Sequence, residues 1–154
     1  MANSRVDRVN GMALHIDQRL LDEIFAHGEA AYPEEGAGLL LGNDDGRQRV
    51  VTSILPFPNA REGEARHNRY LITAEDMLQG EDEAERRGVE IVGVFHSHPD
   101  HPNAPSEYDR EWALPWYSYL ITSIERGKAA GSRSWRLQDN RITFNEEDVV
   151  VDSR

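Results

Sequence analysis

A buried strand that runs into two histidines constrains this chain more than any other feature of its sequence. Residues 89–95, Val-Glu-Ile-Val-Gly-Val-Phe, predict a largely apolar strand, and His96 and His98 follow at once. Side chains two residues apart on a strand point to the same side, so both imidazoles can reach one point. Ser106 and Asp109 follow shortly afterwards. Two imidazoles, one carboxylate and an open fourth position are what catalytic zinc needs.

Each part of this motif also has an ordinary structural interpretation. His96 and His98 could be two partly buried histidines, and the proline-rich linker after them could be only a turn. Ser106-x-x-Asp109 is an acceptable capping box for a short helix that follows Pro105. The combination at this spacing, directly after a buried strand, favours a metal site. The two interpretations can coexist, because a capped helix would hold Asp109 in place.

The composition limits the classes of function. Cysteine is absent, so disulfides and thiol catalysis are excluded and any metal must bind through His, Asp or Glu. The formal net charge of -11 argues against nucleic acid as a partner, because phosphate contacts require clustered Lys and Arg. No apolar run approaches the roughly 20 residues that span a bilayer, and the N-terminal residues lack the apolar middle of a signal peptide. We therefore expect a cytoplasmic protein with no membrane partner.

The length of 154 residues suits one domain with its own core. We expect residues 1–154 to form a single domain in which residues 1–10 are disordered. Hydrophobic spacing predicts strands over 12–16, 37–41, 70–72, 89–95, 116–123 and 149–151. Helical spacing and capping residues predict helices over 17–32, 74–87 and 107–114. Turn signals predict hairpins over 38–55 and 135–144 and a loop over 127–131. Of these, 149–151 is expected to be an edge strand.

A second region of interest precedes the strand predicted over 37–41. Glu34 and Glu35 lie at the start of this strand, where a carboxylate can be half buried beside a site. A glutamate pair between a helix and a strand is ordinarily a pair of solvated charges. Only the motif that begins about sixty residues later, at His96, favours a functional interpretation.

Other polar residues carry weaker signals. The segment 56–69 is a long polar loop entered through two prolines, and it could be a lid, a partner-binding segment or a simple surface excursion. Asn59 and His67 are the side chains of this loop that are best suited to take part in a site. His15 and His27 have no ligand spacing to a partner, so we expect both to be ordinary packing or surface residues.

Together these motifs resemble a known family. Glu35-x-x-Gly38-x-Leu40-x-Gly42, followed by His96-x-His98-Pro-x6-Ser106-x-x-Asp109, is similar to the JAMM metalloproteases, the catalytically competent branch of the MPN domain. The variant around the histidines resembles the small prokaryotic stand-alone members. The resemblance implies an α/β or α+β fold, in which a mixed β-sheet is flanked by helices and which is related to the cytidine deaminase fold.

The resemblance also implies a role for each site residue. His96, His98 and Asp109 would bind one zinc ion per chain. Glu35 would accept a proton from the attacking water and pass it to the leaving amine, and Ser106 would donate a hydrogen bond to the oxyanion. His101 lies outside the family's pattern, so it is expected beside the site or at the surface rather than among the ligands.

The activity implied is that of a zinc-dependent peptidase or isopeptidase. It would hydrolyse an amide bond after the C-terminal Gly-Gly of a ubiquitin-like or sulfur-carrier protein, since only glycine lets a backbone pass through a narrow channel. The alternative is a non-catalytic MPN-type scaffold that binds a ubiquitin-like partner or forms a homodimer. A zinc deaminase is disfavoured, because the Pro-Cys-x-x-Cys part of its signature is absent.

Overall fold

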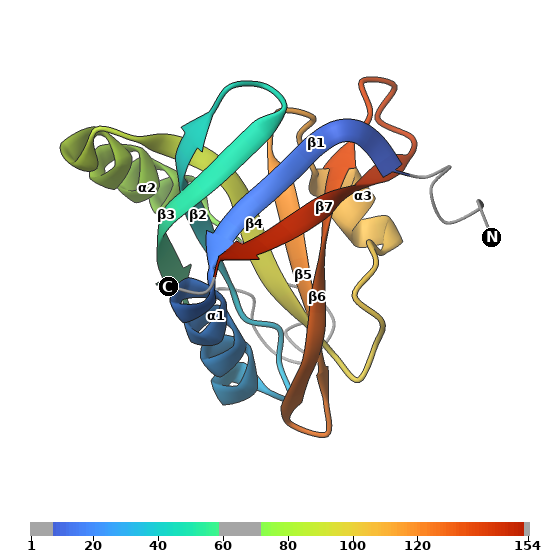
Figure 1. The fold of residues 1–154 in the computed structure, drawn as a ribbon. Helices are drawn as coiled ribbons and strands as arrows, with labels where there is room; N and C mark the ends of the chain where they lie inside the picture. Colours follow the sequence, from blue (N-terminus) through green and yellow to red (C-terminus); the bar gives the residue numbers. More distant parts are fainter. Residues whose placement is uncertain (1–7, 59–71, 153–154) are drawn as a thin grey trace.

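The computed structural model describes residues 8–58 and 72–152, and a seven-stranded sheet dominates these ranges (Figure 1). The elements follow the order β1 (Arg8–Asp17), α1 (Gln18–Ala31), β2 (Ala37–Asp44), β3 (Gln48–Phe57), α2 (Ala74–Arg87), β4 (Glu90–Pro99), α3 (Glu107–Trp112), β5 (Ser118–Glu125), β6 (Lys128–Leu137) and β7 (Phe144–Asp152). The strands pair in the order β1-β3-β2-β4-β5-β6-β7 and close into a barrel. β1 is parallel to β3 and β7, β4 is parallel to β5, and the other pairs are antiparallel, so the predicted mixed sheet is confirmed.

The core lies on both sides of this sheet, as the alternation along β2 shows. Leu40 belongs to an apolar cluster that includes Ile24 of α1. Leu39 and Leu41 belong to a second cluster that includes Ala84 of α2. Because successive strand residues point to opposite faces, one continuously apolar strand serves both clusters. No helix in the described ranges is long and apolar enough to cross a membrane.

The helix ends follow the capping signals in the sequence. The side chain of Asp17 accepts a hydrogen bond from the backbone nitrogen of Leu20 (2.8 Å), which satisfies one of the free amides at the start of α1. Thr73 and Asp76 form a complete capping box at the start of α2. α2 ends at Gly88, whose φ of 71° is a left-handed conformation that glycine adopts without strain.

Two predictions near the chain ends need correction. β1 begins at Arg8, so the last residues of the segment 1–10 form a strand instead of a disordered end. The strand predicted over 149–151 is the end of β7. β7 as a whole is no edge strand, because it pairs with β1 on one side and, through residues 144–147, with β6 on the other. Local sequence patterns carry no information about which distant strand closes a sheet, and this explains both errors.

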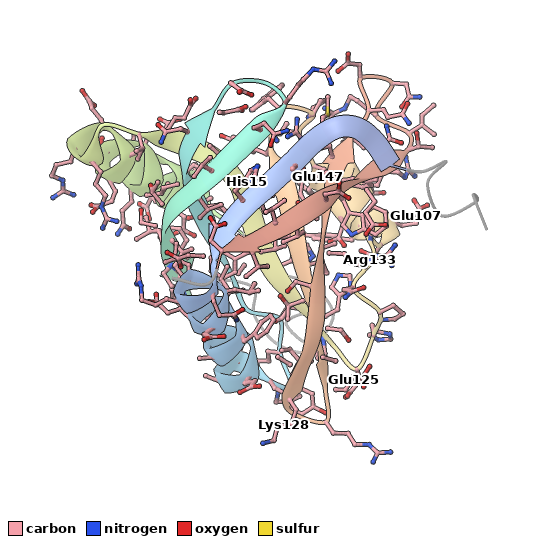
Figure 2. The ribbon with its side chains drawn as sticks, viewed as in Figure 1. His15, Glu107, Glu125, Lys128, Arg133 and Glu147 are labelled. Atoms are coloured by element: carbon pink, nitrogen blue, oxygen red, sulfur yellow. The ribbon has the colours of Figure 1, made fainter. Side chains whose placement is uncertain are left out.

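The predicted loop over 127–131 is also wrong. β5 and β6 form a tight hairpin whose turn residues, Arg126 and Gly127, both have positive φ. Lys128 already begins β6 and pairs with Glu125. Figure 2 shows these two charged side chains at the outer tip of the hairpin. The small residues that follow Lys128 hid the strand, because they lack the bulky β-branched side chains on which the prediction depended.

The predicted loop 56–69 and the predicted strand 70–72 lie almost entirely outside the described residues, and Asn59 and His67 lie outside them as well. The described part shows β3 continuing to Phe57, and the coil residues before α2 begin at Ile72. The structural role of this segment stays a prediction.

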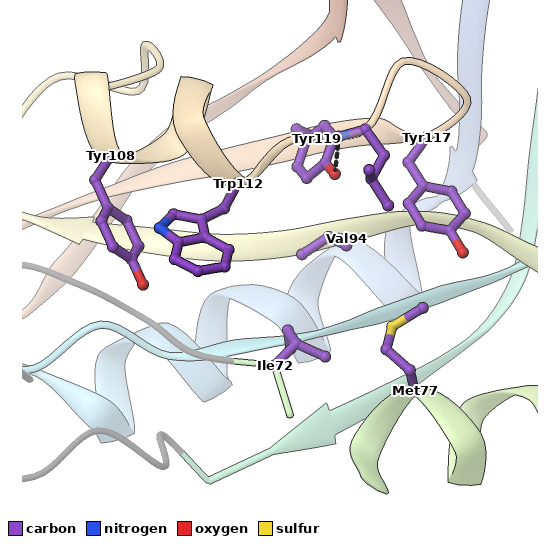
Figure 3. A pocket seen from close by; sticks show the side chains of 8 residues that line it. Ile72, Met77, Val94, Tyr108, Trp112, Tyr117 and Tyr119 are labelled. Atoms are coloured by element: carbon purple, nitrogen blue, oxygen red, sulfur yellow. Dashed lines mark hydrogen bonds between the residues drawn. The ribbon is translucent and has the colours of Figure 1, made fainter. Parts of the chain in front are cut away.

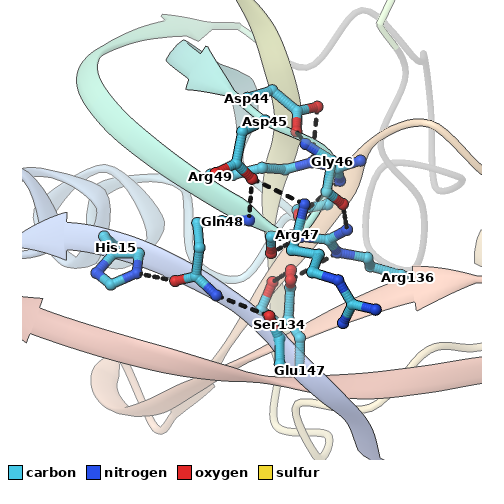
Figure 4. Close-up of polar contacts among 12 residues, drawn as sticks. His15, Asp44, Asp45, Gly46, Arg47, Gln48, Arg49, Ser134, Arg136 and Glu147 are labelled. Carbon is cyan, nitrogen blue, oxygen red and sulfur yellow. Dashed lines mark hydrogen bonds and ion pairs between the residues drawn. The ribbon is translucent and has the colours of Figure 1, made fainter.

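Buried polar contacts join the turn between β2 and β3 to β6 and β7 (Figure 4). Arg136 donates from Nε to Glu147 (2.6 Å) and from Nη1 to the carbonyl of Gly46 (2.8 Å). Arg49 donates to Asp44 (2.9 Å), and the Arg49, Arg136 and Glu147 side chains are nearly fully buried. Buried charges need such pairing, because an unpaired one is strongly destabilising. The network therefore fixes how the final strand joins the sheet.

Tyr119 makes the stability of the fold depend on pH at the alkaline end. Its hydroxyl accepts a hydrogen bond from the nitrogen of Leu114, and burial raises the pKa of Tyr119 to about 12. In the unfolded chain the pKa of tyrosine is about 10. The stabilisation that folding gains from the neutral, buried hydroxyl is therefore fully present below that pH, and it is lost as the pH rises through the folded pKa of about 12. We expect about 2 kcal/mol of the free energy of unfolding to disappear over this interval. Denaturant titrations between these pH values measure the loss.

The variant Tyr119→Phe is the control for this effect. It cannot ionise, so the difference in unfolding free energy between variant and wild type should shrink as the pH rises. A difference that stays constant across the interval would show that Tyr119 is not the group responsible.

Candidate metal centre

The two histidines lie within β4, in the middle of the sheet. β4 runs from Glu90 to Pro99, so the strand continues through both residues instead of ending before them. His96 pairs with Ala37 of the antiparallel neighbour β2, and His98 pairs with Ser123 of the parallel neighbour β5. Both imidazoles are buried, and their centroids lie 5.0 Å apart. The prediction that they point to one side is confirmed.

Asp109 reaches the same point from α3. The hydroxyl of Ser106 accepts from the nitrogen of Asp109 (3.1 Å), and the nitrogen of Ser106 donates to Oδ2 of Asp109 (2.8 Å). This is the predicted capping box, and it is complete. The cap holds the carboxylate against its own helix terminus while the same carboxylate faces the histidines.

The three side chains form one compact cluster. Nε2 of His96 lies 3.2 Å from Nε2 of His98 and 3.3 Å from Oδ1 of Asp109. Nε2 of His98 lies 3.2 Å from Oδ2 of Asp109. One ligand atom from each residue lies within 4.8 Å of the others, and all three residues are buried. Among the described residues, this is the only group of His, Asp and Glu with that geometry.

The hydrogen bonding of His98 shows that the cluster suits a cation. Nδ1 of His98 lies 2.7 Å from the carbonyl oxygen of Pro102, and since a carbonyl only accepts, Nδ1 carries the hydrogen. In the neutral ring, Nε2 then turns a lone pair towards a carboxylate oxygen of Asp109. Two hydrogen-bond acceptors, Nε2 of His98 and Oδ2 of Asp109, then face each other at 3.2 Å. Such an arrangement requires either a cation between the two atoms or a proton on one of them. A divalent cation that accepts two imidazoles and one carboxylate meets this requirement, and zinc is such an ion.

Burial and the interactions of Asp109 with the two histidines shift the pKa values of all three residues. Burial alone lowers the pKa of His98, but the hydrogen bond and charge of Asp109 outweigh it and raise the pKa. For His96, which is more deeply buried, burial prevails and the pKa falls below its ordinary value. Burial raises the pKa of Asp109, but the two imidazoles reverse this and hold the pKa well below its usual range. Asp109 is therefore a carboxylate, the form that binds metals.

Glu35 lies beside this cluster because Gly36 is bound to the histidine strand. The nitrogen of Gly36 donates to Oγ of Ser97 (2.8 Å), and the nitrogen of Ser97 donates to the carbonyl of Gly36 (2.9 Å). Glu35 is 5% exposed and lines a hollow of about 410 Å³ together with His98 and Ser106. The structure thus brings the predicted base to the predicted metal ligands.

His101 is not part of the ligand cluster. Its side chain is exposed and lines the same hollow, while its backbone carbonyl accepts a hydrogen bond from Ser123 (2.7 Å). His101 therefore lies beside the site at the surface, as the sequence predicts.

Sequence reasoning missed two residues that shape the centre. Ser97, between the two histidines, binds Gly36, and the carbonyl of Pro102 orients His98. Strand alternation predicts that Ser97 points away from the histidines, and this was the available signal. No local pattern could have revealed that its hydroxyl meets a residue sixty positions earlier.

An apolar hollow of about 150 Å³ lies next to the centre, between α2 and α3 (Figure 3). Tyr108 and Trp112 line it from α3, on either side of Asp109 in the sequence, and Met77 lines it from α2. Trp112 is 63% exposed, and Trp116 nearby in the sequence is 59% exposed. Exposed aromatic surface of this kind is typical of protein-binding sites.

Fold and donor set together define a sheet-rich domain with a candidate metal site and a buried glutamate beside it. Residues 17–138 match the family described as prokaryotic homologs of the JAB domain, and the chain belongs to this family. The resemblance seen in the sequence is thereby confirmed.

The relatives carry informative names. The chain is 31% identical over 110 residues to a protein of Thermus thermophilus named as a probable TtuB-protein conjugate cleaving protease, covering 70% of each chain. It is 35% identical over 117 residues to a desampylase of Haloferax volcanii, covering 73% of this chain and 80% of the relative. A JAB1/MPN domain protein of Archaeoglobus fulgidus has the same fold, with a TM-score of 0.59, 19% identity, and coverage of 90% of this chain and 99% of the other.

Proposed function

We propose that this protein is a zinc-dependent peptidase that hydrolyses the amide or isopeptide bond after the C-terminal Gly-Gly of a ubiquitin-like or sulfur-carrier protein. One observation carries the proposal: Glu35 lines the same hollow as His98 of the buried His96–His98–Asp109 cluster. The relatives named for cleaving TtuB conjugates and for desampylation support the substrate class.

Each residue of the site has a chemical task in this reaction. His96, His98 and Asp109 would hold the zinc ion, which when bound activates water and polarises the scissile carbonyl. Glu35 takes the proton of the attacking water and returns it to the leaving amine. Ser106 accepts a hydrogen bond from the nitrogen of Asp109, which fixes Oγ while its own hydrogen stays available for the oxyanion.

The proposed partner fits the surroundings of the centre. The apolar hollow with Tyr108 and Trp112 offers contact area for a folded protein beside the metal ligands. A Gly-Gly tail suits a bond that must reach a buried cluster, since it has no side chains to accommodate. We further propose that residues 1–154 form one domain, that the protein is cytoplasmic, and that its fold is related to the cytidine deaminase fold. Its net negative charge argues against nucleic acid as a partner.

The decisive experiment uses substrate proteins of this class. The purified protein is incubated with ubiquitin-like carriers that bear extensions or lysine conjugates after Gly-Gly, and mass spectrometry locates the cleavage. Cleavage after Gly-Gly that a chelator abolishes is the expected result. Binding of the carrier without any cleavage, unchanged by Glu35→Gln, would instead favour the alternative of an MPN-type scaffold.

The metal assignment gives a prediction of its own. Protein purified without chelator is expected to contain about one zinc ion per chain, because three ligand atoms and a fixed His98 tautomer are already in place. Elemental analysis by mass spectrometry measures the content. The variant His96→Ala should lose the metal, and a wild-type content below about one tenth of an equivalent would refute the assignment.

A further inference from the structure

Asp100, which follows His98 by two residues, joins three separate parts of the chain. Its Oδ2 atom accepts a hydrogen bond from the hydroxyl of Tyr32 (2.6 Å), and its Oδ1 atom accepts one from the backbone nitrogen of Arg126 (2.8 Å). Its own nitrogen donates to the carbonyl of Ile124 (2.7 Å). The end of β4 is thereby linked to the residue that follows α1 and to the turn between β5 and β6.

The backbone of Asp100 shows that these contacts hold it in place. Its φ of 58° is a left-handed conformation that residues other than glycine rarely adopt, although aspartate and asparagine do so more often than most. Such backbone persists only where the surrounding structure enforces it, and it is frequent at functional sites. Asp100 is exposed, so its hydrogen bonds, and not burial, enforce the conformation.

The contact with Tyr32 bears on the site because Tyr32 begins the short segment that carries Glu35. At the other end of this segment, Gly36 exchanges two hydrogen bonds with Ser97. Ser97 and Asp100 lie on either side of the second histidine of the cluster. The segment is therefore attached at two points to the strand that carries the histidines. One attachment alone would let the segment pivot about Gly36, whereas two fix its orientation.

The turn between β5 and β6 supports the Tyr32 side of this arrangement, and Figure 1 shows this turn beside the end of α1. The backbone nitrogen of Ala129 donates to Oε2 of Glu29 on α1 (2.8 Å). A methyl group on Gly127 would lie 3.8 Å from Cδ2 of Tyr32, which is an ordinary contact distance, so the ring lies against the turn. Because the turn is bound to both α1 and Asp100, the hydroxyl of Tyr32 has a fixed partner.

We infer that Asp100 and Tyr32 are positioning residues, whose hydrogen bond holds Glu35 in place beside the metal ligands. The inference rests on the proposed function, because it gives this bond a task only if Glu35 moves the proton. The two residues act through the backbone of residues 32–36 and do not touch the substrate. A displacement of about 1 Å can cost roughly 100-fold in rate. Loss of the bond should therefore lower kcat and leave KM and zinc content unchanged.

Three variants test the bond itself. Tyr32→Phe removes the hydroxyl and keeps the ring, and we expect kcat for a Gly-Gly conjugate to fall about tenfold. Asp100→Gly, which suits the left-handed φ, should lose at least as much. Asp100→Asn keeps an oxygen for the nitrogen of Arg126 and gains an amide that can donate to the Tyr32 hydroxyl, so its kcat should stay within about threefold of the wild type.

Asp45→Gly is the matched control. Asp45 is exposed and accepts hydrogen bonds from the backbone nitrogens of Arg47 (2.9 Å) and Gln48 (2.7 Å) in the turn between β2 and β3. This turn lies at the opposite end of β2 from Ala37, the residue that pairs with His96. The control removes the same kind of contact far from the centre, so kcat should equal that of the wild type.

The background Glu35→Gln shows whether the effect passes through Glu35. Where the base is already lost, Tyr32→Phe should lower kcat by no more than about twofold further, because residues that act through one group are not additive. An equal loss in both backgrounds, or a loss that appears in KM or zinc content, would overturn the assignment. So would an unchanged kcat in Tyr32→Phe, or a loss in Asp100→Asn as large as that in Asp100→Gly.

Hydrogen exchange of backbone amides, followed by NMR on the zinc-loaded protein without substrate, keeps this inference distinct from the proposed function. The nitrogen of Glu34 donates to the carbonyl of Ala31 (2.8 Å) within the segment. In Tyr32→Phe, the amide of Glu34 should exchange about tenfold faster, while that of Arg126, still bound to Asp100, should not change. This pattern in a protein that cleaves no Gly-Gly conjugate would support the two-point attachment and refute the peptidase. Unchanged exchange at Glu34 would refute the attachment, whatever the turnover.

Discussion

Replacing Glu35 by glutamine is expected to lower kcat by about 10²- to 10⁴-fold, the range that a positioned general base contributes. Glutamine has the same shape but cannot take a proton from water. The position of the segment should not change, because two hydrogen bonds between Gly36 and Ser97 hold its backbone. The variant should therefore retain its metal and its substrate affinity, and the loss should appear in kcat.

The measurement combines zinc content with steady-state cleavage of a Gly-Gly conjugate. Glu23→Gln is a matched control, since Glu23 lies exposed on α1 and pairs with Arg19 there. Activity of Glu35→Gln within about tenfold of the wild type would mean that another group moves the proton. Loss of zinc together with activity would mean that Glu35 supports the metal instead.

The parts of the fold that depend on neighbouring residues could be predicted. Asp17, Thr73 and Gly88 carry capping chemistry that acts within one helical turn, and each marks a helix end where it was expected. The pairing of β7 with β1 joins the two ends of the described chain, and no local pattern encodes it. Parallel neighbours far apart in sequence must be identified from packing, which a single sequence does not show.

The candidate site also has one part that neighbouring residues predict and another that depends on contacts between distant residues. His96, His98, Ser106 and Asp109 lie within fourteen residues of one another, so strand alternation and a capping box predicted their convergence. His27 was expected to be an ordinary packing or surface residue, and its ring packs edge-on against Phe95 with centroids 5.9 Å apart. The position of Glu35 beside the cluster could not be predicted from neighbouring residues, because it follows from the hydrogen bonds between Gly36 and Ser97 and from the register of β2 against β4.

Asp109 belongs both to a helix cap and to the ligand cluster, and two substitutions should separate these tasks. Asp109→Asn keeps an oxygen that can accept from the nitrogen of Ser106, so α3 should still form. It removes the negative charge that faces His96 and His98. Zinc affinity should therefore fall by more than the roughly 10- to 100-fold that changes around a metal ligand cost, and cleavage should fall to background.

Ser106→Ala makes the opposite change. It removes the hydroxyl that accepts from the nitrogen of Asp109 and should cost about 1 kcal/mol of unfolding free energy, as lost helix caps do. The charge of Asp109 remains, so zinc should still bind while kcat falls through loss of the oxyanion donor, by about 100-fold or more. Competition with a zinc indicator gives the affinities, and thermal unfolding of the metal-free forms gives the stabilities. If Ser106→Ala lost zinc as completely as Asp109→Asn, the cap would be what holds the ligand, and the hydroxyl would need no part in the chemistry.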